Sequence, residues 1–169
     1  MSHLGDRVAD MVTLRRWTPA DRGLLDRFNT PEMTAHQVRS ETDEELDRRH
    51  ERYLSDDLPG AMLVIREDGV AAGAIGYWEH SEDGAETVWE TGWSVVPEFQ
   101  GRGVAGRAVA ALLDVVRADG RRPEIHAYPS VDNAPSNALC RHAGFALRGE
   151  RIFPFRGVDL LSNDWALVL

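Results

Sequence analysis

The sequence contains a single cysteine, Cys140, and no long hydrophobic run. One thiol cannot close an intrachain disulfide, which excludes a secreted fold held together by disulfides. No apolar stretch approaches the roughly 20 residues that cross a bilayer. The N-terminal residues MSHLGDRVADMV are interrupted by charges and lack the apolar core of a signal peptide. We therefore expect a cytoplasmic protein with no membrane partner.

Basic residues are too few for a general nucleic-acid binder. The chain carries 19 basic and 28 acidic residues, a formal net charge of −9, whereas such binders usually present a basic surface. This balance predicts no nucleic-acid partner and favours a small or cationic one. A length of 169 residues with 43% hydrophobic residues predicts one globular domain over residues 1–169. A homodimer is left open.

Patterns for metal or covalent chemistry are also missing. The six histidines include no pair at the usual i, i+4 spacing, and the segment HERYL lacks the second histidine of H-E-x-x-H. Cys140 falls in the middle of an expected helix with no obvious base. We expect neither a metal site nor a cysteine nucleophile.

The hydrophobic pattern predicts an α+β domain with a mostly antiparallel sheet flanked by helices. Helices are expected over 18–29, 42–57, 103–120 and 133–144, the second with Thr42 as N-cap, Glu45 completing a capping box, and Leu46, Tyr53 and Leu54 facing inward. Strands are expected over 11–17, 61–67, 70–80, 85–96, 124–129, 145–153 and 163–169. The Asp68-Gly69 turn makes a hairpin of the second and third strands.

Three glycines, Gly101, Gly103 and Gly106, have the spacing G-x-G-x-x-G of a dinucleotide fingerprint. That fingerprint opens a βαβ unit and has an acid at the end of the next strand, about 20 residues on. Here the glycines follow an antiparallel meander, and the next strand ends in His126, Ala127 and Tyr128. A nicotinamide enzyme therefore becomes a minor alternative.

The same loop favours binding of another phosphate group. Gly101 and Gly103 let backbone amides converge, and a helix N-terminus adds unpaired N–H donors and partial positive charge. The positive charges of Arg102 and Arg107 are unfavourable near the positive end of the helix dipole, unless a bound anion offsets them. The pattern indicates a bound phosphate or pyrophosphate, with a tight turn as the simpler alternative.

These segments resemble the GNAT superfamily of acyl-CoA-dependent N-acyltransferases. QGRGVA (100–105) is similar to its Q/R-x-x-G-x-G/A signature, and NAPSNALCRHAGF (133–145) to its second cofactor helix. ETGWSV (90–95) is similar to a strand of the subgroup that contains the ribosomal-protein alanine N-acetyltransferases. The resemblance implies the GNAT fold, with two central strands that splay apart around acetyl-CoA.

The resemblance also implies roles for particular residues. The coenzyme A pyrophosphate would be held by the backbone of the loop Gln100, Gly101, Arg102, Gly103, Val104 and Ala105. The backbones of Trp93 and Val95 would pair with pantetheine, and Asn133 would hydrogen-bond it with Ser136 nearby. Asn133 alternatively serves only as a helix cap.

Acyl transfer to an amine requires a base, since alkyl ammonium pKa values lie near 10 and only the free amine attacks. Glu90 is the first candidate, with Glu86 and His126 as weaker rivals. Cys140 occupies a position where many GNAT members have a tyrosine that protonates the leaving thiolate. Ser136 is the candidate replacement.

The sequence thus predicts an acetyl-CoA-dependent N-acetyltransferase that acts on a primary amine by direct attack in a ternary complex. The alternative is a catalytically weak acyl-CoA-binding regulator on the same fold. The resemblance implies an acceptor site built from the first helices and the last strands, here residues 27–40 and 151–165. The acidic balance favours an amino sugar, a polyamine or a protein N-terminus. Several aromatic residues are available to line that site, although core packing explains most of them: Trp17, Trp78, Trp89, Trp93, Phe153, Phe155 and Trp165.

Overall fold

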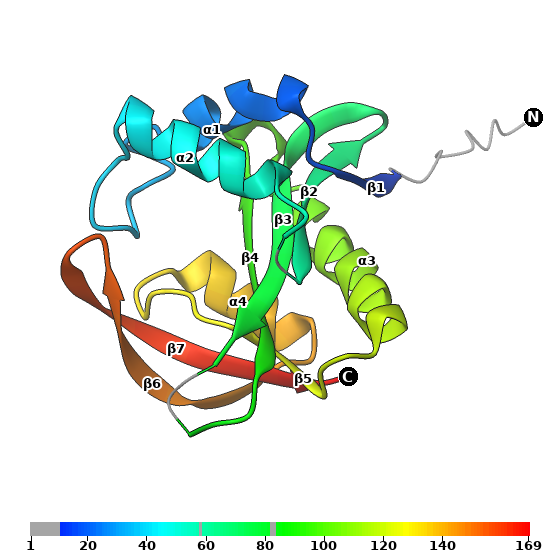
Figure 1. Ribbon diagram of the computed structural model, residues 1–169, viewed down its shortest axis with the longest axis vertical. Coiled ribbons are helices and arrows are strands. Elements are labelled where there is room, and N and C mark those ends of the chain that lie inside the picture. Colours follow the sequence, from blue (N-terminus) through cyan, green and yellow to red (C-terminus); the bar gives the residue numbers. More distant parts are fainter. Residues whose placement is uncertain (1–10, 58, 82–83) are drawn as a thin grey trace, which may run out of the picture.

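The computed structural model describes residues 11–57, 59–81 and 84–169. Its strands form one seven-stranded sheet in the order β1-β2-β3-β4-β5-β7-β6 (Figure 1). All neighbouring strands are antiparallel except β4 and β5, which are parallel. This sheet confirms the expected α+β class. The strands are β1 (Val12–Arg16), β2 (Gly60–Glu67), β3 (Val70–His80), β4 (Val88–Val95), β5 (Glu124–Ala127), β6 (Ala146–Phe155) and β7 (Val158–Val168).

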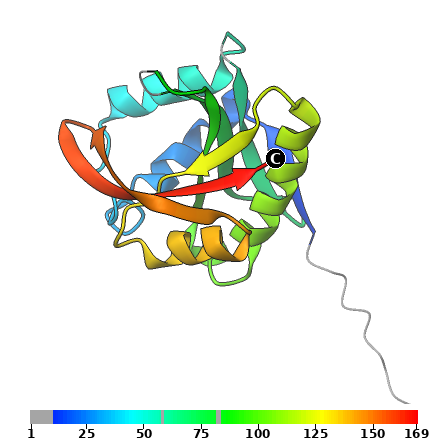
Figure 2. The same ribbon diagram turned by 90° about the horizontal axis from the view of Figure 1, so that it is seen from below.

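Helices cover both faces of the sheet. Within the described residues, the α-helices are α1 (Arg22–Phe28), α2 (Asp43–Leu54), α3 (Val104–Asp119) and α4 (Ala134–His142), and 3-10 helices span Pro19–Asp21 and Pro97–Phe99. Figures 1 and 2 show α1 and α2 on one side and α3 and α4 on the other. The alternation of side chains along each strand supplies one apolar cluster beneath α3 and α4, with Trp89 and Ile125, and another beneath α1 and α2, with Val64 and Ala74.

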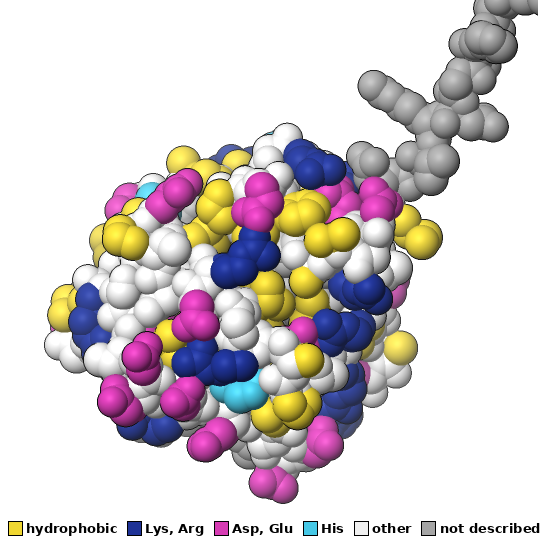
Figure 3. All heavy atoms as spheres, turned by 90° about the horizontal axis from the view of Figure 1, so that it is seen from above, with side chains coloured by type: hydrophobic (Ala, Val, Ile, Leu, Met, Phe, Trp, Pro, Cys, Tyr) yellow, Lys and Arg dark blue, Asp and Glu magenta, His cyan; other side chains and the backbone are white. Residues whose placement is uncertain are grey.

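The start of α2 matches its sequence signal, but its end does not. The Thr42 hydroxyl accepts from the Glu45 N–H, and the Glu45 carboxylate accepts from the Thr42 N–H, which confirms the capping box. Leu46 is buried and Tyr53 packs edge-on against Trp17. The expectation for Leu54 was wrong: as the last residue of α2 it is 36% exposed. Over the face in Figure 3, acidic and basic side chains lie next to one another.

The last two strands are longer than the sequence predicts. They form a continuous hairpin through Arg156 and Gly157, whose φ angles are 51° and 79°. The expected strands left residues 154–162 unassigned, and this segment contains Pro154 and Gly157. Pro154 is tolerated because β6 is an edge strand, where a missing N–H does not break the sheet. The hairpin therefore extends past the sheet toward the segment between α1 and α2 (Figure 1).

Candidate functional site

The site begins where β4 and β5 separate. Trp89, Glu90 and Thr91 pair with Ile125, His126 and Ala127. β5 ends at Ala127, whereas β4 continues to Val95. One edge of β4 is therefore left without a strand partner over its last four residues, as the expected splaying of the central strands requires.

The unpaired edge of β4 turns its backbone groups into this opening. Val96 donates its N–H to the carbonyl of Ala72, at 2.9 Å, so it faces β3. Successive residues of a strand point their N–H and C=O groups in opposite directions. Trp93 and Val95 therefore point theirs away from β3, toward the gap. The Val95 carbonyl accepts a hydrogen bond from Gln100 Nε2 at 2.8 Å, which ties the strand to the loop that follows.

The glycine loop connects β4 to α3. Gly101 and Gly103 have φ angles of 71° and 73°, in the left-handed region that a side chain disfavours. Gly103 is the N-cap of α3 and brings no side-chain cap to it. Val104 is buried and Ala105 half-buried, so they anchor the first turn of the helix. The amides of that turn lack intrahelical acceptors and carry the positive end of the helix dipole.

The two arginines of this loop already have an anionic partner within the protein. Arg107 Nη2 donates to Glu67 Oε1 at 2.8 Å, and Arg102 Nη2 lies 3.0 Å from Glu67 Oε2. Their conflict with the helix dipole therefore does not by itself require a bound phosphate. Sequence reasoning missed Glu67, although it has the same parity as the inward-facing Leu63 and Ile65 and could have been found from that alternation.

Glu90 lies one residue before the strands separate. It pairs in register with Trp78 of β3 and His126 of β5, on the sheet face that α1 and α2 share. Its carboxylate Oε2 is 3.3 Å from His80 Nδ1, and its side chain is 21% exposed. Burial raises the pKa of Glu90 above its ordinary value, and the nearby His80 opposes that rise. A carboxylate with a raised pKa is a stronger base.

Two aromatic rings pack against His80, the neighbour of Glu90. His80 is 5.4 Å from Tyr128 and 5.7 Å from Phe153 between ring centroids, and Tyr128 and Phe153 are 4.6 Å apart. Trp78, 36% exposed, is on the same face. Sequence reasoning included Trp78 and Phe153 but missed His80 and Tyr128. The other tryptophans on this face and in the core are mostly buried packing residues: Trp17, Trp89 and Trp165.

His126 and Glu86, the other two candidate bases, differ from Glu90 in their environments. The ring nitrogens of His126 lie 2.7 Å from Asp164 and 3.2 Å from Glu124. Both ring nitrogens of His126 are thus engaged by carboxylates. Glu86 is exposed and precedes β4. Neither is placed as Glu90 is, with its carboxylate half-buried next to the opening.

The start of α4 lies after β5. Asn133 is its N-cap, and its side-chain oxygen accepts from the Ser136 N–H at 3.2 Å. This is the capping role that the sequence left as the alternative, and the Asn133 side-chain NH₂ remains a possible donor to a ligand. Ser136 is half-buried in the first turn. Cys140 is fully buried, and burial raises the pKa of its thiol to about 12.

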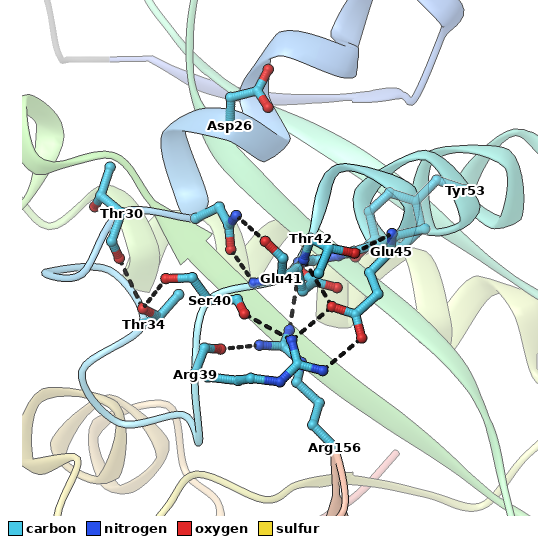
Figure 4. A network of polar contacts seen from close by, with 12 residues as sticks. Asp26, Thr30, Thr34, Arg39, Ser40, Glu41, Thr42, Glu45, Tyr53 and Arg156 are labelled. Atoms are coloured by element: carbon cyan, nitrogen blue, oxygen red, sulfur yellow. Dashed lines mark hydrogen bonds and ion pairs between the residues drawn. The ribbon is translucent and has the colours of Figure 1, made fainter.

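A polar network joins the α1–α2 segment to the β6–β7 turn (Figure 4). Arg156 donates to the carbonyl of Arg39 and lies 3.1 Å from Glu41 Oε2. Arg49 lies 2.6 Å from the same carboxylate oxygen. The turn residues needed for this contact include a non-glycine residue with positive φ, a strained conformation. These are the segments from which the sequence expects the acceptor site.

Two further findings concern the described part of the chain. Among residues 11–57, 59–81 and 84–169, no three His, Cys, Asp or Glu side chains are grouped so that they could hold a metal ion. Within the same ranges, no helix has the length and apolarity needed to cross a membrane.

The sheet, its separated strands and the glycine loop define an acyltransferase architecture, and comparisons with known proteins agree. The acetyltransferase (GNAT) domain model matches residues 11–146. The chain belongs to the GNAT acetyltransferase family, which confirms the resemblance found in the sequence.

One curated relative is a mycothiol acetyltransferase of Clavibacter michiganensis subsp. michiganensis, 38% identical over 88 residues. The match covers 52% of this chain and 27% of the relative, so this chain spans about a quarter of the relative's length.

Similar solved structures cover nearly the whole chain. Salmonella typhimurium yncA, a putative acetyltransferase with its cofactor acetyl-CoA, is 26% identical with a TM-score of 0.75, covering 94% of each chain. Aminoglycoside acetyltransferase AAC(6')-Ib in complex with coenzyme A is 21% identical with a TM-score of 0.78, covering 94% and 95%. A Salmonella typhimurium acetyltransferase that modifies the N-terminal serine of ribosomal protein L7/L12 is 17% identical with a TM-score of 0.75, covering 94% and 95%.

Proposed function

We propose that this protein is an acetyl-CoA-dependent N-acetyltransferase that acetylates a primary amine in a ternary complex. The observation that carries the proposal is the free edge of β4, where Trp93 and Val95 turn their backbone groups into the opening and the chain then enters a glycine loop and a helix N-terminus. An extended pantetheine arm can pair with that edge as an added strand. Its pyrophosphate then reaches the amides of residues 100–105.

The chain's residues fit the steps of direct transfer. Glu90 accepts a proton from the acceptor ammonium, and the free amine attacks the thioester carbonyl. The Val95 N–H, turned into the opening, supplies a donor to the oxygen that becomes negative. A C–N bond forms, the C–S bond breaks, and the coenzyme A thiolate leaves. Ser136 donates its hydroxyl proton to the thiolate and takes up the second proton of the attacking nitrogen, while Glu90 releases its proton to solvent. The products are the amide and the coenzyme A thiol, and no covalent enzyme intermediate is needed.

A cationic amine is the proposed acceptor class. The net charge of −9 favours approach of a cation. Tyr128 and Phe153, which pack against the Glu90 neighbour His80, offer ring faces that attract an ammonium group. The related structures above act on an aminoglycoside and on a protein N-terminal serine, so an amino sugar and a peptide N-terminus are the first acceptors to test.

The test has a binding arm and a turnover arm. Thermal unfolding is measured with acetyl-CoA, coenzyme A, NADH and buffer alone. A ligand at about 100 times its Kd adds roughly 2.7 kcal/mol, which raises the Tm by several degrees. We expect a shift with both coenzyme A forms and none with NADH; no shift with coenzyme A refutes the proposal.

Turnover is then measured as thiol release from acetyl-CoA with a panel of amines. Release that depends on both an amine and Glu90 supports the enzyme. Binding of acetyl-CoA without release for any amine, and without an effect of Glu90→Gln, favours the regulatory alternative. Ser136→Ala should lower kcat while leaving the Kd of coenzyme A unchanged, and an unchanged kcat removes Ser136 from the mechanism.

A further inference from the structure

Glu67 is a buried carboxylate next to the glycine loop, at the end of β2. It is 1% exposed, a position in which a charge is costly unless it is paired. Both of its charged neighbours, Arg102 and Arg107, come from the loop or from the first turn of α3. Arg107 makes a hydrogen bond to Oε1, whereas Arg102 lies 3.0 Å from Oε2 as an ion pair without hydrogen-bond geometry.

Arg107 connects Glu67 to the backbone of the loop. Arg107 donates through Nη2 to Glu67 and through Nη1 to the carbonyl of Arg102, at 3.0 Å. A Cβ built on Gly103 would lie 3.1 Å from Arg107 Nη1, so the guanidinium packs against the loop itself. Glycines restrict the backbone little, and the N-cap glycine provides no side-chain cap. The link through Arg107 therefore restrains the glycine part of the loop, in addition to the hydrogen bond from Gln100 to Val95.

We propose that Glu67 is a positioning residue: it holds Arg102 and Arg107, and through them the loop backbone, in the conformation that binds the pyrophosphate of acetyl-CoA. The inference rests on the proposed function. The side chains of Arg102 and Arg107 are 48% and 38% exposed. Each guanidinium has five N–H donors, so donors remain for a phosphate while Glu67 is engaged.

A competing role predicts the opposite effect. If Glu67 only neutralised the arginines, it would compete with the phosphate for them. Glu67→Gln keeps the side-chain shape and removes one negative charge beside two positive ones. Local charge then changes from +1 to +2, which by Coulomb attraction strengthens anion binding. If Glu67 positions the loop, the weaker hold on Arg102 and Arg107 instead lowers the affinity.

The measurement is the Kd of coenzyme A by titration calorimetry for wild type and Glu67→Gln. We expect the Kd to rise about tenfold, the size expected for one charge-assisted hydrogen bond. The KM for acetyl-CoA should rise with it, while kcat at saturating acetyl-CoA stays within about twofold. The kcat should be spared because Glu67 lies far from Glu90. Glu67 pairs with Val70 at one end of β3, and Glu90 pairs with Trp78, eight residues further along the same strand. At about 3.4 Å per residue, these two positions are about 27 Å apart.

A matched control separates positioning from general destabilisation. Asp21 is also a buried carboxylate, 6% exposed, and accepts two hydrogen bonds of 2.8 Å from Arg15. This pair does not involve the glycine loop. Asp21→Asn should lower the Tm but leave the Kd of coenzyme A unchanged. If Glu67→Gln does not fold, Glu67→Asp keeps the charge and withdraws it by one methylene. Positioning then predicts weaker binding, and competition predicts equal or tighter binding.

The outcomes are distinct. A Kd for Glu67→Gln or Glu67→Asp equal to or below that of wild type overturns the positioning role, as does an equal weakening in Asp21→Asn. A wild-type protein that binds no coenzyme A refutes the proposed function instead, and does so before any variant is measured.

Discussion

Replacing Glu90 with glutamine should change activity and stability in opposite directions. Glu90→Gln keeps the side-chain volume but cannot accept a proton from the acceptor. A general base contributes about 10²–10⁴-fold to a rate, so we expect kcat to fall by that factor, equivalent to roughly 2.7–5.4 kcal/mol of transition-state stabilisation. The Kd of coenzyme A should not change, because the proposed contacts of the cofactor lie beyond Thr91, after the strands separate.

The stability of the same variant follows from burial of the carboxylate. Burial raises the pKa of Glu90, so the folded state binds the proton more tightly than the unfolded chain does. Wild-type stability should therefore decrease as the pH rises from the ordinary glutamate range through the raised pKa, and stay level above it. Glutamine removes this loss, so the Tm of Glu90→Gln at neutral pH should lie above that of wild type.

The assays are kcat and kcat/KM from thiol release across pH, and Tm across the same range. Wild-type kcat/KM should rise with pH through the raised pKa of Glu90, and that limb should vanish in Glu90→Gln. Glu86→Gln, an exposed carboxylate just before β4, is the matched control and should resemble wild type. A Glu90→Gln variant that retains kcat within twofold, or that melts at a lower temperature, would refute the reasoning.

Three further predictions follow from individual contacts. Cys140, fully buried with its thiol pKa raised to about 12, should resist thiol reagents until the protein unfolds, and labelling of the native protein would contradict its placement. Arg156→Ala removes the contact to Glu41; steady-state kinetics should show a higher KM for the acceptor and an unchanged KM for acetyl-CoA. Asp21 has its pKa lowered to about 2, mainly by its hydrogen bond to Arg15. It should contribute about 2 kcal/mol that is present above pH 3.8 and lost as the pH falls toward 2, and acid denaturation of Asp21→Asn should lack that loss.

The local signals were sufficient for most of the fold. The capping box of α2 and the Asp68-Gly69 turn both lie where the sequence placed them, because capping and turn chemistry act over a few residues. Prediction was poorest along the β6–β7 hairpin. Pro154 and Gly157 are turn signals by composition, and only pairing with a neighbouring strand shows that they belong to a hairpin.

For the site, the sequence by itself determined the glycine loop, Glu90 on the strand before it and the cap at Asn133, since each has a recognisable local pattern. Tertiary structure alone decided which side chains meet them. His80 on β3 lies next to Glu90 on the neighbouring strand β4, and Glu67 at the end of β2 contacts Arg102 and Arg107. These contacts join residues 10 to 40 positions apart, and their geometry depends on strand register and sheet twist, which no short-range pattern encodes.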